Sequence, residues 1–280
     1  MSKRIGLIGL DSSHAEDFLR HFNLEGRHTG FRITAMADGD EARMDELDAF
    51  APGLDRAASL NELLGMTDAV IVGHRHGDQH RAAAIAALAA GKPTFVDKPL
   101  ANSVADADAI VAASEMHGTP LLSGSALRWQ AETARLKARV AGIEGDYELM
   151  AYGTWYPDSE YGGAVFYAIH TVELVQELLG IGWKKLRVRS GTNPAVQFKT
   201  NGAIVSLEFR PLGPSGSSAF GVDVEGKGLE FKQPIPLGDD YMAPVAAKFA
   251  KMLESGKPCL SHEELVAPLR LMREIEELLG

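Results

Sequence analysis

Short apolar runs alternate with helical segments over the first 122 residues, and this alternation restricts the fold more than any other feature of the chain. The apolar runs occupy residues 4–10, 31–38, 68–73, 93–99 and 120–124. Helical segments between them include 15–23, 40–50, 80–90 and 104–117. Strands that alternate with helices pair in parallel through right-handed crossovers, with helices on both faces. The pattern predicts a doubly wound parallel sheet.

After residue 122 the sequence changes to closely spaced β-type runs with turn residues between them. These runs include 146–155, 185–190, 196–199, 203–209, 219–226 and 229–234, flanked by helical segments at 126–140, 164–179, 241–254 and 262–279. Such spacing predicts an α+β domain with a mostly antiparallel open sheet. We therefore expect two domains in an α/β chain: a Rossmann domain at 1–122 and an α+β domain at 123–280.

The composition favours a small molecule as the partner. The formal net charge is −10 without a cluster of Lys and Arg, which argues against nucleic acid and anionic membranes. The single cysteine, Cys259, cannot form an internal disulfide. No run of about 18 apolar residues is present to span a membrane. We expect a cytoplasmic protein.

The turn after the first strand departs from the glycine-rich pattern G-x-G-x-x-G that binds a dinucleotide. Counted from Gly9, Asp11 replaces the second glycine and His14 the third. In one interpretation, Ser12, Ser13 and their amides hold the pyrophosphate while the Asp11 side chain turns into the helix end or solvent. In the other, Ser13 opens a capping box with Glu16, and Asp11 is an acid of the first turn.

Two further strand ends carry polar residues. Asp38 ends the second strand, where a carboxylate binds the adenosine ribose 2′-OH and favours NAD over NADP; its alternative role is an N-cap. The segment "GHRHGDQH", residues 73–80, offers His74 and His76 either as metal ligands or as cofactor or substrate contacts. Because their spacing matches no known metal site, we expect no metal.

The fourth strand end, "VDKPLA" at 96–101, places Lys98 before a proline, where partial desolvation would suit it to proton transfer. Together with the Ala-rich helix before it, this segment resembles the glucose–fructose oxidoreductase/inositol dehydrogenase (Gfo/Idh/MocA) family. The residues in register with the family pattern are His80, Gly91, Lys92, Asp97, Lys98, Pro99, Leu100 and Ala101, with Asp97 in place of glutamate. "SGSALRW", "YGGAVFYAIHTVELVQELLG" and the segment from Tyr241 also resemble the family, so the likeness spans the chain.

The resemblance implies an NAD-dependent oxidoreductase that transfers hydride between nicotinamide and a secondary alcohol or ketone of a sugar-like or polyol substrate. Lys98 and His170 are implied as the catalytic pair, converging beside the cofactor. The expected cofactor contacts are Gly9, Asp11, Ser12, Ser13, His14, Asp38, Gly73, His74, Asp97, Lys98 and Pro99. The second domain is implied to bind substrate and to pair with other subunits, which predicts a homo-oligomer, either a dimer or a tetramer.

The catalytic helix departs from the family pattern. Phe166 stands where the family has an aspartate four residues before His170, Tyr167 lies one step round the helix, and Glu173 replaces a later aspartate. We include Tyr167 and Glu173 in the catalytic set, although His170 on a mostly apolar helix is otherwise typical of a buried residue. Residues expected to line the substrate pocket, or else to serve in packing and ion pairing, are Arg128, Trp155, Tyr156 and Tyr161.

These departures leave two other functions open. One is a lyase, isomerase or hydrolase on the same scaffold, with Lys98, His170 and Glu173 as site residues and with metal-bound His74 and His76 as an option. The other is a sugar or nucleotide sensor without turnover. The fold alone does not choose among the three.

Overall fold

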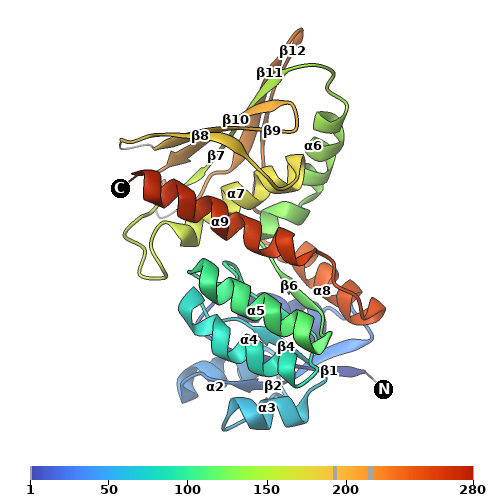
Figure 1. Cartoon of the computed structure of the whole chain (residues 1–280). Helices are drawn as coiled ribbons and strands as arrows, with labels where there is room; N and C mark the ends of the chain where they lie inside the picture. The colour runs from blue at the N-terminus through green and yellow to red at the C-terminus, as the bar shows by residue number, and fades with distance from the viewer. Residues whose placement is uncertain (1, 192–193, 214–216, 280) are drawn as a thin grey trace. The chain divides into compact units, whose positions relative to one another are not determined.

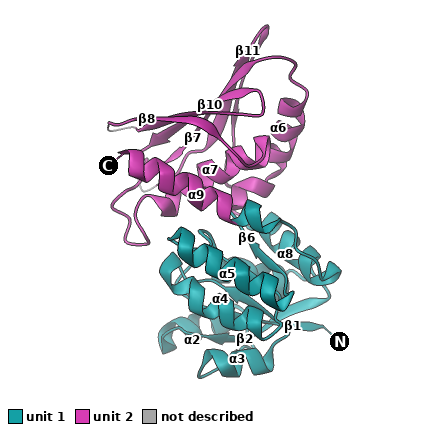
Figure 2. Ribbon diagram, viewed as in Figure 1, with its two compact units in different colours: residues 1–124, 240–265 teal, residues 125–239, 266–280 magenta. Residues whose placement is uncertain are grey.

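A computed structural model describes residues 2–191, 194–213 and 217–279 (Figure 1). The chain divides into two compact units (Figure 2). Unit 1 comprises Met1–Gly124 and Asp240–Leu265, and unit 2 comprises Ser125–Asp239 and Val266–Gly280. The division near residue 124 lies close to the expected boundary, but the sequence assigned 240–265 to the other domain.

Unit 1 contains a six-stranded sheet in the order β3-β2-β1-β4-β5-β6, with every neighbouring pair parallel. Its strands are β1 (Lys3–Ile8), β2 (Phe31–Ala37), β3 (Asp55–Arg56), β4 (Ala69–Val72), β5 (Thr94–Val96) and β6 (Leu121–Ser123). All residues of β4 are buried because this central strand is covered on both faces. The predicted doubly wound Rossmann sheet is confirmed.

Three of the helices of unit 1 begin at a position capped by a side chain. The helices of this unit are α1 (His14–Leu19), the π-helical η1 (Arg20–Leu24), α2 (Glu41–Phe50), α3 (Leu60–Met66), the 3₁₀ turn η2 (Gly77–Gln79), α4 (His80–Ala89), α5 (Val104–His117) and α8 (Ala243–Ser255). Asp40, Ser59 and Ser103 each accept a backbone N–H from the first turn of α2, α3 and α5. The helix expected at 15–23 divides into α1 and η1, and the sequence interpretation omitted α3 and β3.

Helix α8 belongs to unit 1 because its apolar face packs on the N-terminal segments. Phe249, which is fully buried, contacts the rings of Phe22 and Phe95. Lys3 Nζ donates to the Leu253 carbonyl at 2.9 Å. The amphipathic pattern of 241–254 predicted a helix with one buried face, but such a pattern does not say which surface the face covers.

Unit 2 contains a second six-stranded sheet in the order β12-β11-β7-β10-β9-β8. Its strands are β7 (Tyr147–Thr154), β8 (Lys184–Arg189), β9 (Ala195–Thr200), β10 (Ala203–Arg210), β11 (Gly221–Gly226) and β12 (Leu229–Pro234). All neighbouring pairs are antiparallel except β10 and β7, which run parallel. The expected mostly antiparallel open sheet is confirmed.

Alternation along these strands separates a buried face from an exposed one. Leu149, Ala151, Val205 and Leu207 are fully buried, whereas their neighbours along β7 and β10 are partly or fully exposed. Helix α7 (Val165–Leu179) lies on the buried face, against β7 and β10. The other helical elements of unit 2 are η3 (Ala126–Trp129), α6 (Ala131–Ala141) and most of α9 (His262–Leu279).

Within the described ranges, none of the helices combines the length and the apolar character needed to cross a membrane.

Candidate functional site

The carboxyl ends of β1 and β4 approach each other closely at Gly9. Its backbone φ is +79°, and a Cβ atom built there would lie 2.3 Å from the His74 ring. Only glycine therefore fits this position. Gly73 is similarly close, since its Cβ atom would lie 3.0 Å from the Gly9 carbonyl oxygen. The two glycines bring the loops after β1 and β4 into contact at the edge where open parallel sheets bind ligands.

Asp11 turns toward the loop after β4. The Arg75 backbone N–H donates to Asp11 Oδ1 at 3.0 Å, and the residue stays exposed. The Asp11 side chain therefore binds the loop after β4 and remains open to solvent, instead of turning into the end of helix α1. Ser12 is buried, and its Oγ accepts the backbone N–H of His14 at 3.2 Å.

The capping box expected at Ser13 is absent. The Ser13 side chain makes no cap hydrogen bond, and the Glu16 carboxylate instead binds the Arg43 guanidinium, at 2.6 and 2.7 Å. A charged guanidinium is a stronger partner for Glu16 than a backbone amide is. The Ser13 side chain is exposed beside the start of α1.

Asp38 lies at the end of β2 with its side chain 66% exposed. Its φ is +60°, a conformation that aspartate tolerates better than most residues. Its Oδ2 lies 2.8 Å from His74 Nε2, which links the ends of β2 and β4. The alternative role as an N-cap is wrong, because Asp40 accepts the Arg43 N–H at the start of α2. Asp38 has a second carboxylate oxygen available for a ribose hydroxyl.

Asp97 and His14 form a second pair across strand ends. His14 Nδ1 lies 2.7 Å from Asp97 Oδ2, and Asp97 Oδ1 accepts the Lys98 backbone N–H at 2.8 Å. Burial by itself would raise the pKa of the Asp97 carboxyl, but His14 and Lys98 together lower it to about 2. The His14 ring packs edge-on against Tyr241, and burial raises the pKa of that phenol. Asp97 therefore stays ionised and fixes the segment that carries Lys98.

Lys98 is 8% exposed and lies two residues beyond the end of β5. Its segment is held by His80, the first residue of α4, which is fully buried. His80 Nε2 lies 2.7 Å from the His74 carbonyl, and His80 Nδ1 lies 3.0 Å from the Pro99 carbonyl. Burial lowers the pKa of His80. His80 thus connects the loop after β4 with the loop after β5. The sequence interpretation aligned His80 with the family but gave it no role in the site.

In unit 2, His170 lies on α7 beside the start of η3. His170 Nδ1 lies 2.6 Å from Ser125 Oγ, and its ring packs edge-on against Phe220. Glu173 Oε2 accepts the Ser125 backbone N–H at 2.7 Å. The structure thus brings His170 and Glu173 to one side of the helix, as their spacing indicated. Ser125 was not singled out from the sequence, because only the fold brings it to α7.

The structure places Glu173 and Arg128 in a buried ion-pair network. The Glu173 and Arg128 side chains are 5% and 2% exposed, with Arg128 Nη1 3.6 Å from Glu173 Oε2. Arg128 Nε also donates to Glu177 Oε2 at 3.2 Å, and Lys137 pairs with Glu177 at 2.6 Å. Of the two roles considered for Arg128, pairing with an acid is the one observed.

The aromatic residues expected near the substrate contact one another and the helix. Trp155 packs on Phe209, Tyr161 on Phe166, and Tyr156 edge-on against Tyr167. Tyr156 is 41% exposed, whereas Phe166 is buried. Packing therefore accounts for Trp155 and Tyr161, and the exposed Tyr156 is the aromatic residue best placed to meet a ligand.

His74 and His76 do not belong to a group of three metal-type ligands within the described ranges. His74 pairs with Asp38, and the His76 side chain accepts the Asp78 backbone N–H. A group not anticipated from the sequence consists of His21, Glu25 and Asp240. Arg27 contacts both carboxylates of that group, at 2.6 and 2.7 Å, and offsets part of their charge.

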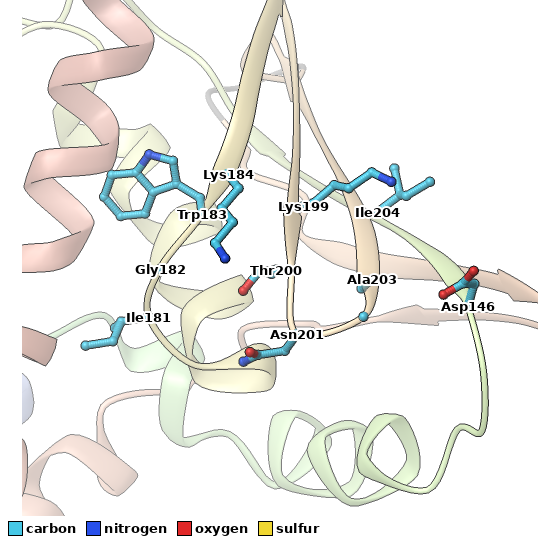
Figure 3. Close-up of a pocket in the computed structure, with 11 residues that line it drawn as sticks. Asp146, Ile181, Gly182, Trp183, Lys184, Lys199, Thr200, Asn201, Ala203 and Ile204 are labelled. Atoms are coloured by element: carbon cyan, nitrogen blue, oxygen red, sulfur yellow. The ribbon is translucent and has the colours of Figure 1, made fainter.

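A cavity of about 510 Å³ in unit 2 is formed where β8, β9 and β10 begin or end (Figure 3). Trp183, Lys184, Lys199 and Asp146 line it, and Figure 3 shows the two lysines on adjacent strands. None of the residues that line it was predicted as a site residue. His170, Glu173 and Ser125 are not among the residues that line it.

Comparison with known proteins agrees with the parallel sheet of unit 1. Residues 3–125 match the family model described as "Oxidoreductase family, NAD-binding Rossmann fold". Inositol 2-dehydrogenase of Cereibacter sphaeroides (strain ATCC 17023) is 34% identical over 132 residues, which cover 46% of this chain and 37% of that protein. The match thus spans little more than a third of the relative's length.

Solved structures share the fold over the whole chain. The structure of GenD2 from gentamicin A biosynthesis, in complex with NAD, has a TM-score of 0.85 at 16% identity and covers 99% of this chain and 94% of that one. Myo-inositol dehydrogenase from Lactobacillus casei, in complex with NAD(H) and myo-inositol, has a TM-score of 0.82 at 16% identity, covering 99% and 94%.

Residues 3–125 accordingly match an NAD-binding Rossmann domain, and the chain joins this domain to an α+β unit. Residues 3–125 are thus similar to the NAD-binding domain of the Gfo/Idh/MocA family.

Proposed function

We propose that this protein is an NAD-dependent dehydrogenase that interconverts a secondary alcohol and a ketone of a sugar-like or polyol substrate. The observation that carries the proposal is the arrangement in unit 1. There, the exposed Asp38 carboxylate and the largely buried Lys98 both follow strands of an NAD-binding sheet, at the edge where such sheets bind ligands. Relatives named inositol 2-dehydrogenase support the substrate class.

The residues of unit 1 fit the nicotinamide dinucleotide. Gly9 has no side chain, so its backbone leaves room for the dinucleotide to approach. Asp38 offers a carboxylate oxygen to a ribose diol, and its negative charge disfavours a 2′-phosphate. NAD, when bound, supplies the hydride acceptor. The chain's own contribution is to bind, to orient and to handle the proton of the hydroxyl group.

We assign the acceptance of that proton to Lys98 and the contact with the substrate oxygen to His170. Lys98 is held by the buried Asp97 and by the loop that His80 fixes, and His170 is held by Ser125. Glu173 supports the same helix by accepting the Ser125 N–H, and Tyr167 lies beside Phe166 on the preceding turn. Because Lys98 and His170 belong to different units, their joint action is a functional proposal.

The test is a titration of metal-stripped protein with NADH and NADPH, followed by turnover with NAD⁺ and a panel of polyols that includes myo-inositol. We expect NADH to bind more tightly than NADPH and Lys98→Met and His170→Ala to lose turnover while keeping NADH affinity. Lys251→Met and His117→Ala, at exposed positions, serve as matched controls. Full turnover in both site variants, or no NADH binding by the unaltered protein, would refute the proposal.

We also propose that the exposed face of the second sheet pairs with a second copy of this chain. Strand register aligns one row of side chains across all six strands of that face. In order from β12 to β8, the row is Glu230, Glu225, Glu148, Ile204, Lys199 and Lys184. Neighbouring like charges on a sheet are destabilising when nothing opposes them. A two-fold axis parallel to the strands would lay the acidic half of one copy on the basic half of the other.

A further inference from the structure

The hydroxyl group of Ser125 contacts a ring nitrogen of His170 and so bears on where the imidazole carries its proton. Ser125 is fully buried and precedes η3, where its Oγ accepts the Leu127 backbone N–H at 3.1 Å. Its backbone N–H donates to Glu173 Oε2. These two hydrogen bonds fix the backbone and side chain of Ser125, so the hydroxyl group faces His170 Nδ1 at 2.6 Å.

The position of the hydroxyl proton follows from its surroundings. A buried hydroxyl group donates its proton to an acceptor, because an unsatisfied donor is costly. Around Ser125, the acceptor found among the described contacts is His170 Nδ1. An imidazole nitrogen that accepts a hydrogen bond carries no proton. Neutral His170 therefore holds its proton on Nε2.

A carboxylate beside His170 Nδ1, in place of the Ser125 hydroxyl group, would favour the other tautomer. It accepts but does not donate, so it places the imidazole proton on Nδ1 and leaves Nε2 as a base. Phe166, one turn before His170, is buried against Tyr161 and Tyr167 and offers no such acceptor. The contact at Nδ1 is therefore the Ser125 hydroxyl group, which can both donate and accept.

We propose that Ser125 is a positioning residue that holds neutral His170 in the tautomer with its proton on Nε2, so that His170 donates a hydrogen bond to the substrate oxygen. This inference rests on the dehydrogenase proposed above. Oxidation uses the fraction of the protein in which the Lys98 amine has lost its proton. The C–H bond breaks as hydride passes to NAD⁺, the O–H proton passes to that amine, and a ketone and a lysine ammonium group result. His170 keeps its proton throughout and polarises the oxygen, as a neutral imidazole does.

The tautomer is measurable without turnover. Protein labelled with ¹⁵N-histidine gives long-range ¹H–¹⁵N correlations that distinguish a protonated ring nitrogen from an unprotonated one. The chain has nine histidines, and the signals lost in His170→Gln identify those of His170. At a pH where His170 is neutral, we expect Nε2 protonated and Nδ1 unprotonated. A protonated Nδ1 in the unaltered protein would overturn the proposal.

Three variants separate the hydroxyl group from packing. Ser125→Ala removes the donor and is expected to give a mixture of tautomers, whereas Ser125→Thr keeps a hydroxyl group and restores the Nε2 form. Thr133→Val is the matched control. Thr133 Oγ1 is also a buried hydroxyl group, and it donates to the carbonyl of Leu127, the residue whose N–H binds Ser125, at 2.6 Å. Thr133→Val should leave the His170 signals unchanged. If Ser125→Ala folds and His170 keeps the same tautomer, the role of Ser125 is refuted. If Ser125→Ala does not fold, the ring nitrogen that carries the proton in the unaltered protein still tests the proposal.

Turnover distinguishes the failure of this inference from failure of the proposed function. With NAD⁺ and myo-inositol, Ser125→Ala should lower kcat about tenfold or more with little change in KM, and Ser125→Thr should recover it. An Nε2 tautomer in a protein that turns over no polyol would leave the tautomer assignment intact and refute the dehydrogenase. Turnover of a polyol by a protein whose His170 carries its proton on Nδ1 would support the dehydrogenase and refute the role of Ser125.

Discussion

The Asp38 carboxylate is expected to determine how tightly the protein binds NADH. It is exposed, occupies a left-handed backbone conformation and has one oxygen paired with His74. We expect Asp38→Asn to weaken NADH binding about tenfold to a hundredfold, because hydrogen bonds to a charged group contribute about 1.5–3 kcal/mol. Asparagine is the appropriate replacement since it tolerates the positive φ. Calorimetric titration with NADH and NADPH measures both affinities.

The control for Asp38 is the neighbouring acid, Asp40. Asp40→Ala removes the N-cap of α2 and should cost about 1 kcal/mol of stability while leaving NADH affinity unchanged. Equal NADH affinity in Asp38→Asn and the unaltered protein would contradict the ribose role. A smaller preference for NADH over NADPH in Asp38→Asn would support it.

Asp97 gives the protein a specific sensitivity to acid. Its pKa of about 2 lies below the value of about 3.9 expected in the unfolded chain. A depressed folded-state pKa stabilises the fold above pH 4, and that stabilisation is lost as the pH falls toward 2. The contribution is about 2–3 kcal/mol at neutral pH and about half of that at pH 3. Asp97→Asn should therefore cost more at pH 7 than at pH 3 in urea unfolding.

The matched substitution for Asp97 is Asp78→Asn, at an exposed position. It should leave the stability unchanged at either pH. If Asp97→Asn lost the same free energy of unfolding at pH 7 and pH 3, the carboxylate would not be the group that titrates.

The sequence located the polar residues of unit 1 but not their partners. Parallel strands end at one edge, so Asp11, Asp38 and Asp97 were expected to lie together. Their contacts with Arg75, His74 and His14 were not predictable, because each joins loops that are far apart in the chain and depends on side-chain rotamers. The burial of Arg128 was missed for the same reason.

At the scale of elements, His80 joins α4 to the loops after β4 and β5. It is fully buried, and burial lowers its pKa, which favours the neutral form in the folded state. A neutral imidazole carries one N–H and donates to only one of the two carbonyl groups beside it. The unfolded chain takes up a proton below about pH 6.5, which costs stability as the pH falls further. We expect His80→Leu to lose about 1–3 kcal/mol at pH 8, because the carbonyl group that accepted the His80 N–H loses its buried hydrogen bond. The variant should also show a flatter stability profile between pH 8 and pH 5.

Chemical unfolding at several pH values tests this prediction. The control is a substitution of a histidine that does not bridge two loops. His117, at the exposed end of α5, is suitable, and His117→Ala should keep the profile of the unaltered protein. A pH profile in His80→Leu as steep as that of the unaltered protein would show that other groups cause the acid sensitivity.

Elements were predictable where local pattern decides them. Apolar runs marked the buried strands of the first sheet, and alternation marked those of the second, because burial on two faces or one leaves those signatures. The two-residue strand β3 and the seven-residue helix α3 have too few residues to show a period. The packing of α8 on unit 1 is a long-range contact, which local pattern does not encode.

At the scale of the whole molecule, the charges on the second sheet specify one arrangement of two copies. With a two-fold axis parallel to the strands, Glu225 of one copy faces Lys199 of the other, and Glu230 faces Lys184. An axis across the strands would instead place acid against acid, at a cost of several kcal/mol. The exposed cavity lined by Lys184 and Lys199 would then lie beneath the acidic strands of the second copy.

A charge exchange tests this arrangement. Glu225→Lys and Lys199→Glu should each weaken self-association, because each puts like charges in contact, whereas the double variant restores opposite charges and should recover the oligomer. Sedimentation equilibrium measures the mass, and raising the salt concentration should weaken the unaltered assembly through screening. Lys251→Glu, on α8 of the other unit, is the control of equal charge change. Equal association in all four proteins would place the interface elsewhere, and a double variant no better than the singles would exclude this two-fold axis.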